Sequence, residues 1–425
     1  MSDTPHPTSA PQSDPPPTPQ SLRHALQPHF PAGLLPTELL LRVFQLLPMM
    51  YAAEVREDLV AWTVTSSCPD LPLLARVCRA WRPAAQSTLF HSVSLVRRSQ
   101  VLGFIKTARL RPDLAAKVVS MQVGMVRGTP EYSDPHDQQV EHSDRCIEAI
   151  SLAPRIRHVL ISQLKRGTRW QIVEVLEGRP IRTLLFKMYD SELVDTSVLT
   201  SPRDVFRAFS MPTLRTFELN FRPKWSPHAD YTVPGPTPSL DSLSIAVNAP
   251  AGLFRLMAAA APNLVRLQIY TENALDPVGA TVAFRGLVNV CEFRFESNVP
   301  EATHASNRWL QALLPSFARL QRLSVCEQAA DWGFLRALPP ALELVEYLYW
   351  DARPDQSLQE LEAALRGRAA LPLARLVLTV DEMAFEATVE EQDVKRVTDA
   401  LVARGVAFRI GFEALEIPTI HRVGF

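Results

Sequence analysis

The sequence has 425 residues, of which 47% are hydrophobic and 21% are charged, and its formal net charge is -1. This apolar content is too high for a disordered chain, so it predicts one extended core or several compact ones. The balanced charge excludes a general attraction to nucleic acid or to an anionic membrane, and neither is expected as a partner.

The cysteines and the N-terminal region bear on the compartment. No CxxC pair or other metal-ligand spacing occurs among Cys68, Cys78, Cys146, Cys291 and Cys326, which favours a reducing compartment. No positively charged leader precedes an apolar segment, and Glu38 and Arg42 interrupt the most apolar early stretch. We expect a soluble protein of the cytoplasm, the nucleus or both.

The N-terminal segment, residues 1–31, is rich in Pro, Ser, Thr and Gln and is predicted to be a disordered tail. Residues 32–91 are predicted to form three short helices. Pro36 suits the first turn of a helix, and the next apolar residues recur at helical spacing. Further helices are predicted over 70–81 and 83–90. Helices this short scarcely bury a core alone, so their apolar faces need a partner or the remainder of the chain.

A repeated phrase runs through the region 92–425. In it a hydrophobic residue is followed by two variable positions, a hydrophobe, one variable position and a further hydrophobe. The phrase usually follows a proline and returns at intervals of roughly 20 to 35 residues, which fits strand-plus-helix repeats. Its copies lie at 156–161, 181–186, 214–219, 240–245, 264–269, 290–295, 320–325, 342–347 and 373–378.

Short amphipathic stretches between these copies predict helices that alternate with the strands. They lie at 170–176, 205–209, 253–260, 309–314, 334–338 and 358–365. The alternation predicts parallel strands joined by right-handed crossovers. The predicted fold is therefore α/β: a curved leucine-rich-repeat-like solenoid with parallel strands on its concave face and short helices outside.

Both ends of the solenoid carry signals of their own. Strands predicted over 93–95 and 118–123 open the solenoid, and a helix over 394–402 with a strand over 406–410 closes it. Gly405 stands where a glycine commonly ends a helix.

The densest polar segment is 134–144, which holds histidines and carboxylates together. Its turn-rich composition predicts a solvated loop rather than a metal site, and no metal ligand is expected. The sequence has none of the common catalytic or cofactor motifs, so we expect a non-catalytic protein without a cofactor. The alternative is an enzyme whose groups meet from distant positions.

Three segments carry a resemblance. The chain resembles the F-box family in three segments: Leu35-Pro36-x-Glu38 ahead of an aliphatic helix, Leu74-Ala-Arg-Val-Cys-Arg-Ala-Trp81, and Leu89-Phe90-x-x-Val93. The link over 48–69 is longer than is usual in that family. The resemblance implies docking on the Skp-type adaptor, and through it on the cullin, of a cullin-RING ubiquitin ligase, while the repeats hold a protein client for ubiquitination. The adaptor-binding residues that it implies are Leu35, Pro36, Leu39, Leu40, Val43, Phe44, Val77, Cys78 and Trp81.

Two other interpretations of these residues stay open. They could form an intramolecular helical cap on the solenoid, which also needs its first repeat covered. The chain could also be a repeat scaffold for protein–protein interaction outside any ligase.

The variable positions of the strands predict a client-binding surface. They should face the concave side, because successive side chains of a strand alternate. In the later repeats they hold Arg266, Arg294, Arg322 and Arg375. Arginine presents a planar fork that matches carboxylate and phosphate, so we hypothesise that these residues bind an acidic or phosphorylated client segment. The alternative is an ordinary solvated face with mixed charges.

Overall fold

The computed structural model describes a set of ranges with gaps between them. These are residues 36, 39–40, 79, 81–125, 129–165, 172–187, 207–220, 240–247, 258, 260, 262–271, 281–282, 284–297, 308–326, 331–349, 354–366, 371–381, 385 and 389–413. The predicted tail over 1–31 lies outside them, as does almost all of the predicted helix over 70–81.

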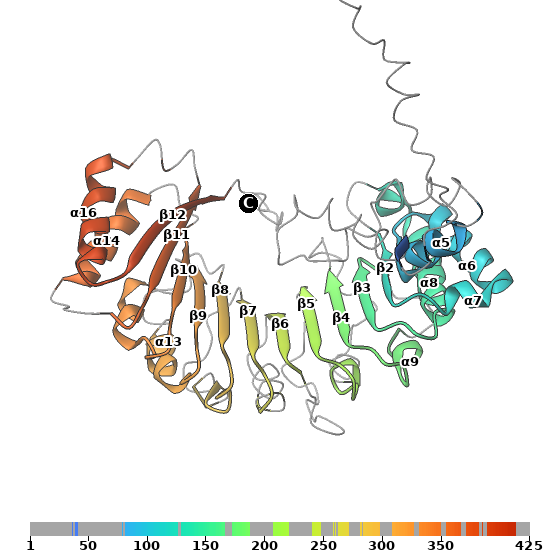
Figure 1. Ribbon diagram of the computed structural model, residues 1–425, viewed down its shortest axis with the longest axis horizontal. Coiled ribbons are helices and arrows are strands. Elements are labelled where there is room, and N and C mark those ends of the chain that lie inside the picture. Colours follow the sequence, from blue (N-terminus) through green and yellow to red (C-terminus); the bar gives the residue numbers. More distant parts are fainter. Residues whose placement is uncertain are drawn as a thin grey trace, which may run out of the picture.

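A single parallel sheet of twelve strands forms the body of the molecule, and each strand pairs with its neighbours in the sequence. Figure 1 shows the strands side by side around an arc. The predicted α/β solenoid of parallel strands is confirmed. The strands are β1 (Ser92–Leu95), β2 (Ser120–Gly124), β3 (His158–Ser162), β4 (Thr183–Lys187), β5 (Thr216–Asn220), β6 (Ser242–Val247), β7 (Arg266–Thr271), β8 (Glu292–Ser297), β9 (Arg322–Cys326), β10 (Leu344–Leu348), β11 (Arg375–Asp381) and β12 (Ala407–Glu413).

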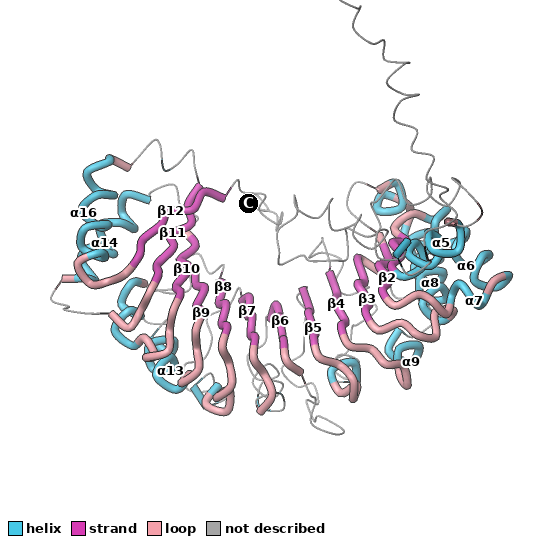
Figure 2. The backbone as a smooth tube through the Cα atoms, viewed as in Figure 1, coloured by secondary structure: helices cyan, strands magenta, loops and turns pink. Residues whose placement is uncertain are grey.

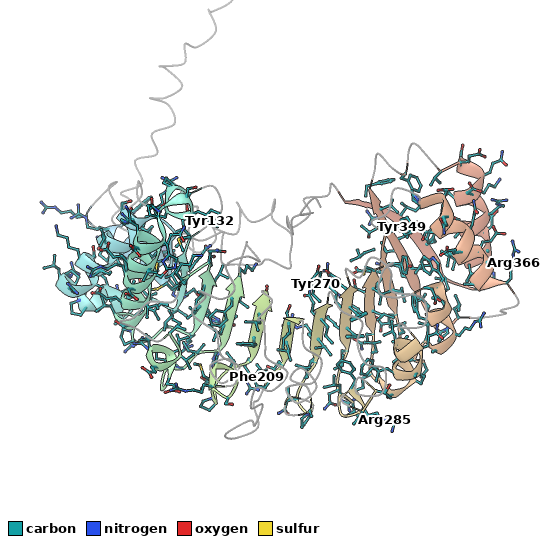
Figure 3. All side chains as sticks on the ribbon, turned by 180° about the vertical axis from the view of Figure 1, so that it is seen from behind. Tyr132, Phe209, Tyr270, Arg285, Tyr349 and Arg366 are labelled. Carbon is teal, nitrogen blue, oxygen red and sulfur yellow. The ribbon has the colours of Figure 1, made fainter. Side chains whose placement is uncertain are left out.

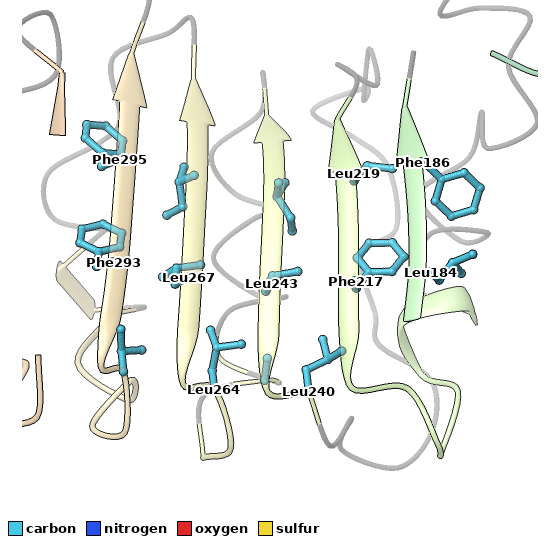
Figure 4. Packing of buried hydrophobic residues seen from close by; sticks show 14 of the residues in the cluster. Leu184, Phe186, Phe217, Leu219, Leu240, Leu243, Leu264, Leu267, Phe293 and Phe295 are labelled. Atoms are coloured by element: carbon cyan, nitrogen blue, oxygen red, sulfur yellow. The ribbon is translucent and has the colours of Figure 1, made fainter. Parts of the chain in front are cut away.

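Each repeat contributes hydrophobic residues to rows that run across the sheet (Figure 4). Phe217 of β5 is in register with Leu243 of β6, and each is at most 1% exposed. Two residues further along, Leu219 is in register with Ile245. Leu240 lies just before its strand and is fully buried. Burying such a side chain contributes about 1.5–3 kcal/mol, and no repeat buries its own rows without neighbours.

Helices lie on the outer side of the sheet and at its two ends (Figure 2). The link segment predicted as a helix over 334–338 forms a 3-10 helix, Trp332–Ala337, and Pro339 and Pro340 follow it. The helical elements are α5 (Arg82–His91), α6 (Arg98–Leu110), α7 (Pro112–Ala115), η2 (Pro130–Ser133), α8 (His136–Ser151), α9 (Ile172–Leu176), α13 (Arg308–Leu313), η4 (Leu314–Ser316), η5 (Trp332–Ala337), α14 (Pro354–Leu365) and α16 (Glu391–Val402).

The solvated loop predicted over 134–144 is wrong, because α8 begins at His136 and continues to Ser151. Its buried face includes His142, Cys146 and Ile150, which follow one another at four-residue spacing. Only its first turn, residues 136–139, is polar throughout. Histidine and serine on its inner face concealed the helical period in the sequence.

The closing unit is confirmed at the C-terminal end of the sheet. Gly405 has a φ of 76°, the left-handed conformation expected after a helix end. Beside it, the guanidinium of Arg404 donates to the Leu365 carbonyl oxygen at 2.9 Å, so α16 is tied to the end of α14. Within the described ranges, no helix is long and apolar enough to cross a membrane.

Candidate interaction surface

The outward-facing positions of the strands form two rows across the concave face. The first row holds the first residue of each strand, and the second row lies two residues further along. Figure 3 shows Tyr270 toward the far ends of the strands, while Arg285 lies at the opposite, outer side. Because neighbouring strands are in register, the two rows form a continuous surface. The residue type in each row changes from strand to strand.

Hydroxyl groups and one imidazole dominate the first row over β3 to β6. His158 Nδ1 lies 3.0 Å from Thr183 Oγ1, which orients the imidazole ring. Thr216 and Ser242 continue the row in register. Leu160, the second-row residue of β3, is only 4% exposed.

Glu218 lies in the second row of this part, on β5. Partial burial raises the pKa of its carboxyl, and the positive charge of Lys187 opposes that rise. A carboxyl group so placed favours its neutral form more than a solvated one does.

The later strands carry the arginines that the sequence singled out. Arg266, Arg322 and Arg375 occupy the first row and Arg294 the second. They are not a uniform positive surface. Arg322 lies 3.9 Å from the Glu292 carboxylate, and Arg294 pairs with Glu296. The Arg322–Glu292 pair is exposed and contributes at most about 1 kcal/mol, so a stronger anion can displace Glu292, whereas Glu296 is buried.

Three of the residues implied as adaptor-binding lie in the helix after Pro36 or at its start. The Leu39 N–H donates to the Pro36 carbonyl oxygen at 3.0 Å, so the chain turns helical here. Leu39 is 48% exposed, whereas Leu40 is 3% exposed. One leucine is thus available to a partner and the other packs within the chain. Trp81 is partly buried where α5 begins; Leu35, Val43, Phe44, Val77 and Cys78 lie outside the described residues.

A further set of residues lies where the strands begin, and the sequence pattern did not single it out. The backbone N–H of Arg182 donates to the carbonyl oxygen of Arg157 at 2.6 Å. The backbone N–H of Arg215 in turn donates to the carbonyl oxygen of Arg182 at 2.8 Å. All three side chains are exposed. They occupy the second position of three consecutive phrases, and that shared position was the signal available in the sequence. We call Arg157, Arg182 and Arg215 the arginine rim.

One Cys–His pair has the composition of a nucleophile and its base. Cys146 Sγ lies 3.6 Å from His142 Nε2. Burial raises the pKa of the thiol to about 12, and both side chains are at most 1% exposed. The thiolate is the reactive form, so this pair is a core contact rather than a nucleophilic centre. Across the described ranges, no three His, Cys, Asp or Glu side chains gather as a ligand set for a metal ion.

No protein-family model matches this sequence, and no curated protein matches it. Among solved structures, the leucine-rich repeat-containing protein LegL7 from Legionella pneumophila is similar at 12% identity and a TM-score of 0.38, over 71% of this chain and 88% of that one. TLR13, solved in a complex with ssRNA13, is similar at 11% identity and a TM-score of 0.33, over 77% of this chain and 37% of that one. The sheet topology itself defines this chain as a leucine-rich-repeat-like solenoid.

Proposed function

We propose that this protein is the client receptor of a cullin-RING ubiquitin ligase, in which residues 35–81 dock on a Skp-type adaptor and the concave face holds a protein client. The observation that carries the proposal is that Leu39 is exposed in the helical turn that follows Pro36, within the segment that resembles an F-box. An apolar side chain that is 48% exposed suits a partner that covers it.

The solenoid supplies the second half of the proposal. Solenoids offer long concave surfaces for other proteins, and here twelve strands line such a surface. The chain would contribute no reactive group of its own, because catalysis comes from holding the client near a charged ubiquitin-conjugating enzyme. The cytoplasm and the nucleus are the compartments in which we propose that it acts.

The test is co-purification of the full-length chain with a Skp-type adaptor. Leu39→Arg places a charge in the proposed contact, and the recovered adaptor should fall at least about tenfold, as for a buried interface anchor. Leu35→Ala with Pro36→Ala should act in the same direction. The matched control is Arg294→Glu with Arg322→Glu, which alters the concave face and should leave the adaptor bound. Undiminished adaptor binding by Leu39→Arg would contradict the proposal.

The second candidate function is a repeat scaffold that binds proteins outside any ligase. The buried Leu40 favours it, because this side chain shows that part of the same helix packs within the chain. If complexes purified with the wild-type protein contain client proteins but no adaptor, the scaffold function is the correct one.

A further inference from the structure

The arginine rim places like charges side by side, which is unfavourable unless something neutralises them. Neighbouring strands are about 4.8 Å apart, so the bases of these side chains follow one another at that spacing. Like charges directly opposite one another on a sheet are destabilising. At one end Arg215 lies 3.5 Å from the Asp241 carboxylate. Among the residues that the structure describes, Arg157 and Arg182 form no ion pair, and both are exposed.

His158, the first residue of β3, follows Arg157 directly and is in register with Thr183, which follows Arg182. Burial is the main cause that lowers the pKa of this imidazole, and Arg182, Arg157 and His91 lower it further. Arg157, His158, Arg182 and Thr183 are therefore neighbours at the starts of β3 and β4. Thr183 contributes a hydroxyl there, 3.0 Å from His158 Nδ1.

The donors at this place match a phosphate monoester better than a carboxylate. One guanidinium fork already satisfies the two oxygens of a carboxylate. A phosphate monoester carries about -1.5 to -2 charges and three acceptor oxygens, so two forks and a hydroxyl can serve one group. The rim covers three strands, about 10 Å between its first and last members, which suits one phosphate group rather than a long backbone track.

We infer that Arg157 and Arg182, with His158 and Thr183 beside them, form a binding site for the phosphate group of a phosphorylated protein segment. The rim position changes character at β6, where Asp241 occupies it, and at β10, where Glu343 does. The arginine rim is thus confined to the starts of β3, β4 and β5, which are neighbours in Figure 1, and the site lies at β3 and β4. This inference rests on the proposed binding of a protein client by the solenoid, but not on adaptor docking.

Fluorescence anisotropy on the full-length protein tests the site. The probe is a labelled peptide with one phosphoserine among alanine and glycine, and the same peptide with serine is the reference. Wild-type protein should bind the phosphopeptide and not the reference. Arg157→Gln with Arg182→Gln should weaken binding at least about tenfold, since charged hydrogen bonds to a phosphate are strong. Replacing both by lysine should give an intermediate loss, because the charge remains but the forks are gone.

The matched control is Arg336→Gln with Arg409→Gln, which removes the same charge from two exposed residues toward the far end of the sheet. Its affinity should stay within about twofold of wild type, because separated exposed charges act weakly at ordinary salt. Equal losses in the two double variants, or a loss in the control alone, would overturn the site. Absence of phosphopeptide binding by the wild type would do the same.

Two competitors separate the possible sources of phosphate. Inorganic phosphate should displace the peptide only far above the peptide's own concentration, and an oligothymidylate of equal length should bind more weakly than the peptide. The opposite result with either competitor would overturn the assignment to a protein segment. Adaptor recovery is measured on the same variants. A variant that still binds the adaptor but no longer binds the phosphopeptide shows that this site is separate from the proposed adaptor docking.

Discussion

The Cα atom of Gly124 faces the backbone carbonyl of Ser162 so closely that a Cβ on Gly124 would lie 1.7 Å from its oxygen. The two residues are register partners at the ends of β2 and β3. Gly124 also has a φ of 111°, a backbone conformation that residues with a side chain rarely adopt. Glycine is therefore required here for two independent reasons.

Gly124→Ala should lower the free energy of unfolding by about 3 kcal/mol or more, because backbone strain and a backbone collision add. Chemical denaturation of the purified protein measures the change. Gly103→Ala is the control: Gly103 lies in α6, and a Cβ added to it would meet no neighbouring atom within 4 Å. That variant should gain about 0.5–1 kcal/mol from helix propensity. Equal stability of the two variants would contradict the account.

The sequence predicts the strands well because each carries its own buried row. Leu240, Leu243 and Ile245 are hydrophobic at fixed offsets and all are at most 1% exposed. Their spacing indicates both the strand and the side that faces the core. Parallel pairing then follows from the helices or turns between strands.

Helix α8 escaped prediction because its inner face mixes polar and apolar side chains. His142 and Ser143 are buried as fully as Cys146 is, and a hydrophobic period alone misses them. The Ser143 hydroxyl accepts from the Lys165 N–H at 2.9 Å, a partner far along the chain. Contacts of this kind satisfy buried polar groups, and no local pattern records them.

The candidate surface was predictable in position but not in pairing. Alternation places Arg294 and Arg322 on the concave face, as the strands confirm. Their acidic partners Glu296 and Glu292 depend on side-chain geometry. The arginine rim was visible only once the phrases were aligned at their second position.

Arg179 closes the C-terminal end of α8, and its replacement should be costly. Its guanidinium donates to the carbonyl oxygens of Ala153 at 2.6 Å, Ser151 at 2.9 Å and Ile150 at 3.1 Å. Arg179→Ala removes this donor from all three carbonyl oxygens, of which those of Ile150 and Ala153 keep a backbone N–H donor, and it removes a positive charge from the helix end. The free energy of unfolding should fall by about 2–4 kcal/mol.

Lysine at this position should recover part of the loss, since its ammonium keeps the charge but cannot reach three carbonyls at once. Arg182→Ala is the control for general charge removal, because Arg182 is exposed and should change stability by less than about 0.5 kcal/mol. Thermal and urea unfolding measure all three variants. A loss for Arg182→Ala as large as that for Arg179→Ala would show that the carbonyl contacts are unimportant.

His142 should make the fold sensitive to acid. Burial lowers the pKa of its imidazole, Arg98 lowers it further, and Glu131 and Asp134 partly oppose these effects. The unfolded chain keeps an ordinary pKa of about 6.5, so it takes up a proton more readily as the pH falls through that value. The stability contributed by neutral His142 is therefore complete above about pH 6.5 and is lost as the pH falls through the lower, folded pKa.

His142→Gln removes this proton and should flatten the fall in unfolding free energy between pH 8 and pH 5, whatever its effect at pH 8. His136→Gln is the control on the same helix, since the His136 side chain is 58% exposed and should leave the wild-type slope intact. Urea denaturation at several pH values gives each slope. Both substitutions remove one histidine from α8, so the burial of His142 is the difference between them. Identical slopes for His142→Gln and wild type would show that His142 is not the cause of the acid sensitivity.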